Sequence, residues 1–148
     1  MFGSIVVGTD GSQTARTAVD RAVELAKAVG ARLEIVSAYE PVGGQRLREE
    51  RQQAPTDVQW TVNPREDVDD TLEQAAEAAR EAGLTEVEVH ARQGDPADAI
   101  LDVAEERGAD LIVVGNKGMT GAKRFLLGSV PNKISHNAPC SVLIVRTT

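Results

Sequence analysis

Short apolar segments alternate with longer segments of helical periodicity along almost the whole chain of 148 residues. The strand-like segments lie at residues 4–9, 33–38, 86–90, 111–114 and 142–145. Strands separated by helices need crossover connections, which pack the helices against both faces of a mostly parallel sheet. Together with the length, the alternation predicts one α/β domain, residues 1–148.

Signals at the ends of the helical segments support this interpretation. Ser12 can cap a first helix, and Gly30 suits the left-handed backbone position that follows it. Asn63-Pro64 and Asp95-Pro96 each combine a capping side chain with a first-turn proline, so two further helices are expected to begin there. A last helix is expected from about Val130 to His136.

The strand-like segments differ in how much of their surface they can bury. Residues 86–90 alternate strictly, as Glu-Val-Glu-Val-His, so one face of this strand is expected to meet water and His90 to be exposed. Such a strand suits the edge of a sheet. Residues 111–114 are apolar at every position, which predicts a strand buried on both faces.

An irregular, charged segment at residues 40–62 interrupts the alternation. A connection of this length inside a compact domain is usually functional or mobile. Its charge and lack of periodicity also fit a solvated, partly disordered excursion. Tyr39 and Trp60 flank the segment and are expected to hold its ends against the rest of the domain.

The formal net charge of −7 and the isoelectric point near 4.8 disfavour binding to nucleic acid or to an anionic membrane. No apolar run approaches the roughly 20 residues that span a bilayer, and the N-terminus shows no signal-peptide pattern. A single cysteine, Cys140, excludes an intrachain disulfide and suits a reducing compartment. These properties predict a cytoplasmic protein.

A glycine-containing segment begins where the apolar run 111–114 ends. It reads Gly115-Asn116-Lys117-Gly118, and Gly128-Ser129 follows at the start of the last expected helix. Glycines let the backbone approach a ligand closely, and the amides at a helix N-terminus attract anions. The segment is therefore a candidate phosphate-binding loop, in which the Ser129 hydroxyl can cap the helix or contact a phosphate oxygen.

Basic side chains favour phosphate binding over ordinary turn glycines. Lys117, Lys123 and Arg124 gather in this one loop of an acidic protein, where they would create a positive field for an anion. The same residues also fit solvated loop charges, so this alternative stays open.

The end of the first strand is a second candidate contact region. The carboxylate of Asp10 can bond to nearby turn amides, face a ligand, or do both. Ligands of parallel α/β sheets bind beyond the carboxyl ends of the strands, where the strand order reverses. If the first and fourth strands flank that point, Thr9-Asp10 and Gly115 face one crevice.

Three separated motifs resemble those of the universal stress protein family. The pattern Gly-x2-Gly-x9-Gly-Ser, which runs from Gly115 to Ser129, is similar to the family's nucleotide-binding signature. Residues 5–12 resemble the family's first strand and turn, and residues 138–145 resemble its closing strand. The similarity covers essentially the whole chain apart from residues 40–62.

The resemblance implies an open five-stranded parallel sheet of order 3-2-1-4-5 with helices on both faces, as in adenine-nucleotide alpha-hydrolase-like proteins. It implies ATP as the ligand, with the glycine signature near the ribose and phosphates and the ends of the first two strands near the adenine. The residues expected to bind the nucleotide are Thr9, Asp10, Ala38, Gly115, Lys117, Gly118, Gly128, Ser129 and Val130.

The resemblance also implies a homodimer, because family members pair through the last strand, here Val142 to Val145. Covering an apolar edge strand by dimerisation is physically reasonable as well. Mg²⁺ bridging the phosphates is compatible with such a site, but no second carboxylate is placed to complete a protein-built metal site. No metal ligands are therefore expected.

Pro131 departs from an ideal phosphate-binding helix and suggests an alternative ligand. Because proline lacks an N–H, the first turn of the last helix offers one donor fewer. Some family members bind cyclic AMP, and a site with fewer donors fits a single phosphate. Cyclic AMP is therefore the alternative to ATP.

The favoured function is an ATP-binding regulatory protein of the stress response with little or no turnover. No general base is evident beside the phosphates, and the Walker Gly-Lys-Ser/Thr run is absent. A slow ATPase or adenylating enzyme is an alternative, although the Ser-Gly-Gly run of related ATP-pyrophosphatases is missing after the first strand. A partner-binding module without nucleotide fits less well, because the glycine signature is present.

Overall fold

The computed structural model describes residues 2–39, 65–116 and 127–147. Their strands are β1 (Ser4–Gly8), β2 (Arg32–Tyr39), β3 (Val87–Gln93), β4 (Leu111–Gly115) and β5 (Ser141–Val145). Their helices are α1 (Gln13–Val29), α3 (Arg65–Glu81), α4 (Pro96–Glu106) and α5 (Ser129–Asn137). Of the helices that the described residues form, none is both long and apolar enough to cross a membrane.

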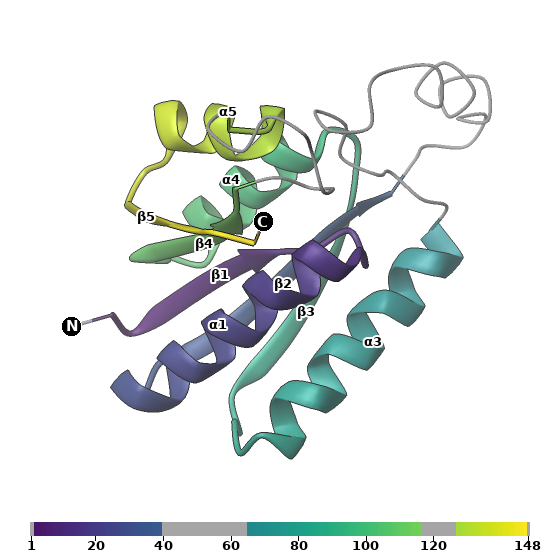
Figure 1. Cartoon of the computed structure of the whole chain (residues 1–148), viewed down its shortest axis with the longest axis vertical. Helices are drawn as coiled ribbons and strands as arrows, with labels where there is room; N and C mark the ends of the chain where they lie inside the picture. The colour runs from purple at the N-terminus through teal and green to yellow at the C-terminus, as the bar shows by residue number, and fades with distance from the viewer. Residues whose placement is uncertain (1, 40–64, 117–126, 148) are drawn as a thin grey trace.

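The strands form one parallel sheet in the order β3-β2-β1-β4-β5. Figure 1 shows α1 and α3 on one face of this sheet and α4 and α5 on the other. The strand order reverses between β1 and β4, which pair with Val7 level with Val113. The predicted fold class, order and reversal point are therefore confirmed.

The central strands separate two hydrophobic cores. Ile5 and Val7 contribute to the core under α1 and α3, whereas Val6 and Ile112 contribute to the core under α4 and α5. Every residue of β1 and β4 is buried, as expected for parallel strands covered on both faces. This arrangement gives the carboxyl ends of β1 and β4 a rigid base.

The capping signals predicted for α1 and α4 are confirmed. The Ser12 hydroxyl accepts a hydrogen bond from the Ala15 amide (3.2 Å), and Gly30 ends α1 at φ +72°. Asp95 caps α4 by accepting from the Asp98 amide (3.0 Å). Asn63-Pro64 lies outside the described residues.

β3 is an edge strand as predicted, and Glu88 on its polar face is exposed as expected, but His90 on the same face is not. Only 13% of the His90 side chain is exposed, and its Nε2 lies 2.8 Å from Oε1 of Glu34 in β2. Arg107, at the end of α4, covers this face and donates from Nε to the same oxygen (2.9 Å). The prediction of an exposed His90 is wrong, because α4 places an arginine over the strand.

Tyr39, at the end of β2, contacts the first residue of α3. The Arg65 guanidinium lies 4.9 Å from the centre of the Tyr39 ring and donates to its hydroxyl (3.1 Å). This cation–π contact joins the end of β2 to the start of α3, and the holding role expected of Tyr39 toward residues 40–62 stays a prediction. Trp60, its expected counterpart, and the segment 40–62 lie outside the described residues.

Candidate functional site

The first part of the candidate site is the turn between β1 and α1. The Thr9 amide donates to the Val36 carbonyl (2.9 Å) and so extends the pairing of β1 with β2. The Thr9 hydroxyl accepts from the Gly11 amide (3.1 Å), and the Asp10 carboxylate accepts from the Ser12 amide (2.9 Å). These bonds fold the turn, with Gly11 at φ +81°, where glycine has no Cβ to strain.

Thr9 and Asp10 are both buried in this turn. The turn interpretation of Asp10 is confirmed by its bond to the Ser12 amide, and the ligand-facing interpretation remains a prediction. The register that aligns Val7 with Val113 makes Thr9 level with Gly115. The structure therefore brings the ends of the first and fourth strands together.

The second part of the site lies where β4 ends and α5 begins. The Asn116 amide donates to the Val145 carbonyl (2.8 Å), and the Gly128 amide donates to the Asn116 carbonyl (2.9 Å). The second bond places the start of α5 directly at the end of β4. Lys117 and Gly118, together with Lys123 and Arg124, lie outside the described residues.

Gly128, rather than Ser129, is the N-cap residue of α5. Ser129 is the first helical residue, so the capping role predicted for its hydroxyl is not adopted. The helical ladder begins with the Asn132 amide, which donates to the Gly128 carbonyl (3.1 Å). Since Pro131 has no N–H, the first turn of α5 presents the amides of Ser129 and Val130.

Two kinds of contact fix α5 against α4. Nζ of Lys133 lies 2.9 Å from Oδ1 of Asp98 and 3.3 Å from Oδ2 of Asp95. The hydrogen bond to Asp98, with a further contribution from Asp95, raises the pKa of Lys133. Val130 and Ile134 are buried in the core that α4 and α5 cover. Ion pairs and apolar packing therefore both hold α5 against α4.

Ala38 lies near the carboxyl end of β2, beside β1. Its side chain is buried in the core under α4 and α5, so only its backbone is suited to border a ligand at the edge. Ala38, the β1 turn and the start of α5 all lie at the carboxyl ends of the central strands. The predicted site residues that the structure gathers along this edge are Thr9, Asp10, Ala38, Gly115, Gly128, Ser129 and Val130.

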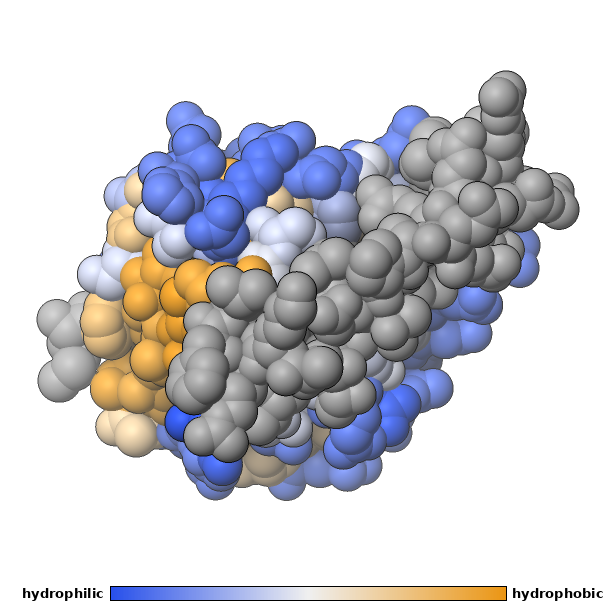
Figure 2. Space-filling model, turned by 45° about the horizontal axis from the view of Figure 1, so that its top comes forward, coloured by the Kyte–Doolittle hydropathy of each residue, from blue (hydrophilic) through white to orange (hydrophobic). Residues whose placement is uncertain are grey.

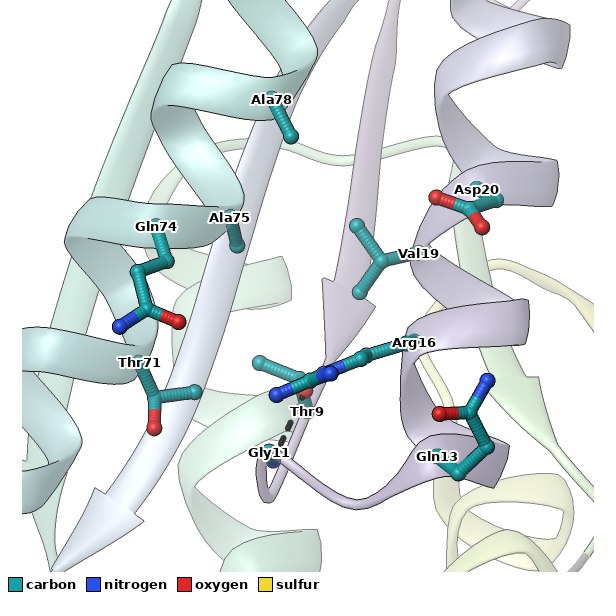
Figure 3. A pocket seen from close by; sticks show the side chains of 10 residues that line it. All are labelled: Thr9, Gly11, Gln13, Arg16, Val19, Asp20, Thr71, Gln74, Ala75 and Ala78. Atoms are coloured by element: carbon teal, nitrogen blue, oxygen red, sulfur yellow. Dashed lines mark hydrogen bonds between the residues drawn. The ribbon is translucent and has the colours of Figure 1, made fainter.

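A cavity of about 320 Å³ lies between α1 and α3, on the other face of the sheet from α5 (Figure 3). Thr9 and Gly11 line one end, so it adjoins the β1 turn. Arg16 of α1 and Thr71 and Gln74 of α3 supply polar walls. Sequence reasoning did not single out these three, because each lies at a polar position of an amphipathic helix.

A network of charged residues lies on the α4 side of β2 and β3. Glu34 is fully buried, and the Arg107 that donates to it also lies 2.7 Å, through Nη2, from Oε2 of Glu88. Ligand atoms of Glu34, Glu88 and His90 lie within 4.8 Å of one another, a spacing compatible with a cation. Arg107 contacts both carboxylates and Nε of Arg32 lies 3.6 Å from Oε2 of Glu34, so two cations balance the two carboxylates and this arrangement is an ion-pair network. Its signal in the sequence was a glutamate inside the apolar run 33–38.

The chain is similar to known proteins over almost its whole length. The model of the universal stress protein family matches residues 1–146. Universal stress protein Rv1636 of Mycobacterium tuberculosis is 41% identical, over 99% of this chain and 98% of the relative. A universal stress protein solved in complex with cAMP is 36% identical with a TM-score of 0.74, covering 99% of this chain and 98% of that one.

A more distant structure agrees in fold. UspA from Lactobacillus plantarum is 23% identical, has a TM-score of 0.76 and covers 97% of each chain. At this identity the likeness concerns the fold alone, which is the same parallel α/β sheet. From the family model and the identity to Rv1636, we conclude that this chain belongs to the universal stress protein family.

Proposed function

We propose that this chain is a regulatory stress-response protein that binds an adenine nucleotide where β1, β4 and the start of α5 meet. One observation carries the proposal: the Gly128 amide donates to the Asn116 carbonyl, so the first turn of α5 lies against the end of a central strand. The N-terminus of a helix carries partial positive charge and attracts phosphates. The reversal of strand order at β1 and β4 supports the same location.

For ATP, the first candidate ligand, we assign contacts by region. The β1 turn (Thr9 and Asp10) and the backbone of Ala38 border the adenine. The loop after β4 approaches the ribose and phosphates through glycine backbone, and Lys117 supplies positive charge. The residues assigned to the ribose and phosphates are Gly115, Lys117, Gly118, Gly128, Ser129 and Val130.

Cyclic AMP is the second candidate, and two observations favour it. A 36% identical universal stress protein was solved in complex with cAMP. In the first turn of α5, Pro131 has no amide to offer, and the Gly128 amide is bonded to Asn116. A donor set reduced in this way suits one phosphate better than three.

We propose that the nucleotide is bound without turnover. Within the described part of this edge, the carboxylate is that of Asp10, whose Oδ1 already accepts from the Ser12 amide. A general base needs to reach the proton that it removes, and this bond directs Asp10 toward its own turn. Mg²⁺ would then be bound mainly by the phosphates rather than by protein ligands. We place this function in the cytoplasm.

Dimerisation through β5 is part of the same proposal. β5 is an edge strand, so one side of its backbone has no partner strand within the sheet. Its side chains are apolar from Val142 to Val145, and Leu143 is 41% exposed. Figure 2 shows a hydrophobic area on the side of the molecule where β5 lies in Figure 1. A second copy pairing along β5 would cover this area.

Calorimetric titration with ATP, ADP, AMP and cyclic AMP tests the nucleotide proposal. We expect saturable binding of ATP or cyclic AMP by the natural sequence. Gly118→Glu is expected to weaken that binding about 100-fold or more, because its carboxylate would occupy the position of a phosphate. Thr85→Glu adds the same charge at an exposed position before β3, at the opposite edge of the sheet, and is expected to leave the affinity unchanged.

Two results would count against the proposal. One is the absence of binding by the natural sequence. The other is normal affinity in Gly118→Glu, since that variant introduces like charge into the assigned phosphate position.

A further inference from the structure

Asn116 connects three separate parts of the chain. Its backbone joins β5 through Val145 and the start of α5 through Gly128, with distances of 2.8 and 2.9 Å. Its side-chain Oδ1 accepts from both the amide and the hydroxyl of Thr147, each at 2.9 Å. Asn116 is only 7% exposed. The residue therefore ties the end of β4, the first turn of α5 and the segment after β5 to one another.

The chemistry of the Asn116 side chain suits this position. The carboxamide oxygen accepts two hydrogen bonds without carrying charge. Alanine would leave the donors of Thr147 without this acceptor, and losing such a partner in a partly buried place costs free energy. Aspartate would accept the same bonds but would add negative charge next to the start of α5, where the assigned ligand is an anion.

We infer that Asn116 is a positioning residue for phosphate recognition, held in place by Thr147. This inference rests on the proposed nucleotide-binding function. The Asn116 carbonyl holds the Gly128 amide, and Val130, whose amide is assigned to phosphate, follows two residues later. When Oδ1 is anchored to Thr147, the peptide that carries this carbonyl cannot rotate freely. The anchor thus sets where the phosphate-facing amides point.

The adenine side of the site does not depend on this anchor. Thr9 is held by its bond to Val36 of β2, and Ala38 belongs to β2 itself. Loss of the Asn116 side chain is therefore expected to weaken the binding of ligands that carry a phosphate and to leave the binding of ligands without one nearly unchanged. A residue with a purely structural role would affect all ligands alike.

The test compares cyclic AMP and ATP with adenosine, which shares the base and the ribose but has no phosphate. In calorimetric titrations, Asn116→Ala is expected to weaken the binding of both nucleotides about 10-fold and that of adenosine less than about twofold. Thr147→Val removes one of the two bonds and is expected to weaken nucleotide binding about threefold. The double variant is expected to match Asn116→Ala, because the shared acceptor is already gone.

Asn137→Ala is the matched control. Asn137 lies at the other end of α5, where its side-chain amide donates to the Lys133 carbonyl (2.8 Å) at an exposed position. All three affinities are expected to stay unchanged in this variant. Circular dichroism and thermal melting verify that each variant is folded.

The outcomes separate this inference from the function on which it rests. Equal losses for adenosine and the nucleotides, or no loss at all, would overturn the positioning role of Asn116. If Asn116→Ala does not fold, Thr147→Val decides by the same comparison of ligands. A natural sequence that binds none of the three ligands refutes the proposed function itself, and this is seen before any variant is measured.

Discussion

β3 and β5 are the two edge strands of the sheet, and they differ in the side chains that border them. β3 is lined by ion pairs, such as Arg92 with Glu106 at 2.6 Å, whereas β5 contains no charged residue. Each strand exposes one large apolar side chain to the same extent, 42% for Val89 and 41% for Leu143. Exposure of a single apolar residue therefore does not distinguish the two edges.

The charges make the difference between the two edges. A strand edge bordered by charged side chains disfavours pairing with another chain, because pairing would remove those charges from water. Pairing along the apolar β5 removes no charged side chain of this strand from water, and burial of its apolar side chains is favourable. The comparison indicates that β3 stays an edge while β5 is available for the proposed dimer.

The largest effect is expected from a charge placed on β5. Leu143→Arg is expected to raise the dissociation constant of the proposed dimer about 30-fold or more, because a central apolar contact becomes an unpaired charge. Val89→Arg, at the equally exposed position of β3, is expected to leave assembly unchanged. Sedimentation equilibrium measures both constants. Equal effects at the two positions would contradict the claim that β5 rather than β3 pairs with a second copy. A natural sequence that stays monomeric would contradict it as well.

A second effect is expected from the buried charge behind β3. Arg107→Met keeps much of the aliphatic volume but removes one of the two guanidinium groups beside the fully buried Glu34, leaving Nε of Arg32 at 3.6 Å from its Oε2. Removing one partner of a buried ion pair destabilises by about 3 kcal/mol when the remaining charge is uncompensated, and because Arg32 stays beside Glu34 we expect a loss of about 1.5 kcal/mol. Urea denaturation measures the free energy of unfolding of both forms. A loss below about 0.5 kcal/mol would mean that the network contributes little to holding this edge.

The smallest effect is expected from the exposed pair of Arg92 and Glu106. The hydrogen bond from Arg92 lowers the pKa of Glu106. Because the pKa is lower in the folded state, the pair stabilises above the ordinary glutamate pKa of about 4.3 and loses this contribution as the pH falls through the folded-state value. Arg92→Met is thus expected to lower Tm by about 1 °C or less at neutral pH.

Melting curves over a range of pH check this expectation. The difference in Tm between the natural sequence and Arg92→Met is expected to vanish in acid, below the pKa of Glu106 in the folded state. A difference that stays constant into acid would show that Arg92 acts through packing of its side chain rather than through its charge.

The family resemblance implied the sheet order, and the strict alternation of residues 86–90 predicted β3 as an edge strand, because that alternation is a local pattern. Neither predicted the environment of Glu34 and His90, since their contacts come from strands and a helix that are distant in sequence: His90 lies 56 residues beyond Glu34. The alternation of residues 86–90 identified the polar face correctly. What covers that face was decided by the end of α4.

In the candidate site, too, local patterns were predictable from the sequence and contacts between distant elements were not. The glycine motif and Thr9-Asp10 were visible in the sequence because backbone conformation and anion binding require particular residue types at particular spacing. The link from Asn116 to Thr147 was not, because it spans 31 residues and forms only when β5 pairs with β4. The N-cap of α5 is Gly128 rather than Ser129, and the amide of Gly128 donates to the Asn116 carbonyl at the end of β4, a contact that no local pattern indicated.

By itself, the sequence determined the α/β alternation, the capping of α1 and α4 and the glycine signature after β4, because each depends on the intrinsic preferences of residues close in the chain. Only the tertiary structure decided which side chains meet across elements: Glu34 with Arg107, Asn116 with Thr147, and Leu143 on an open edge. The physical reason is that burial and hydrogen bonding at a distance are properties of the assembled sheet. They do not exist until its strands are in register.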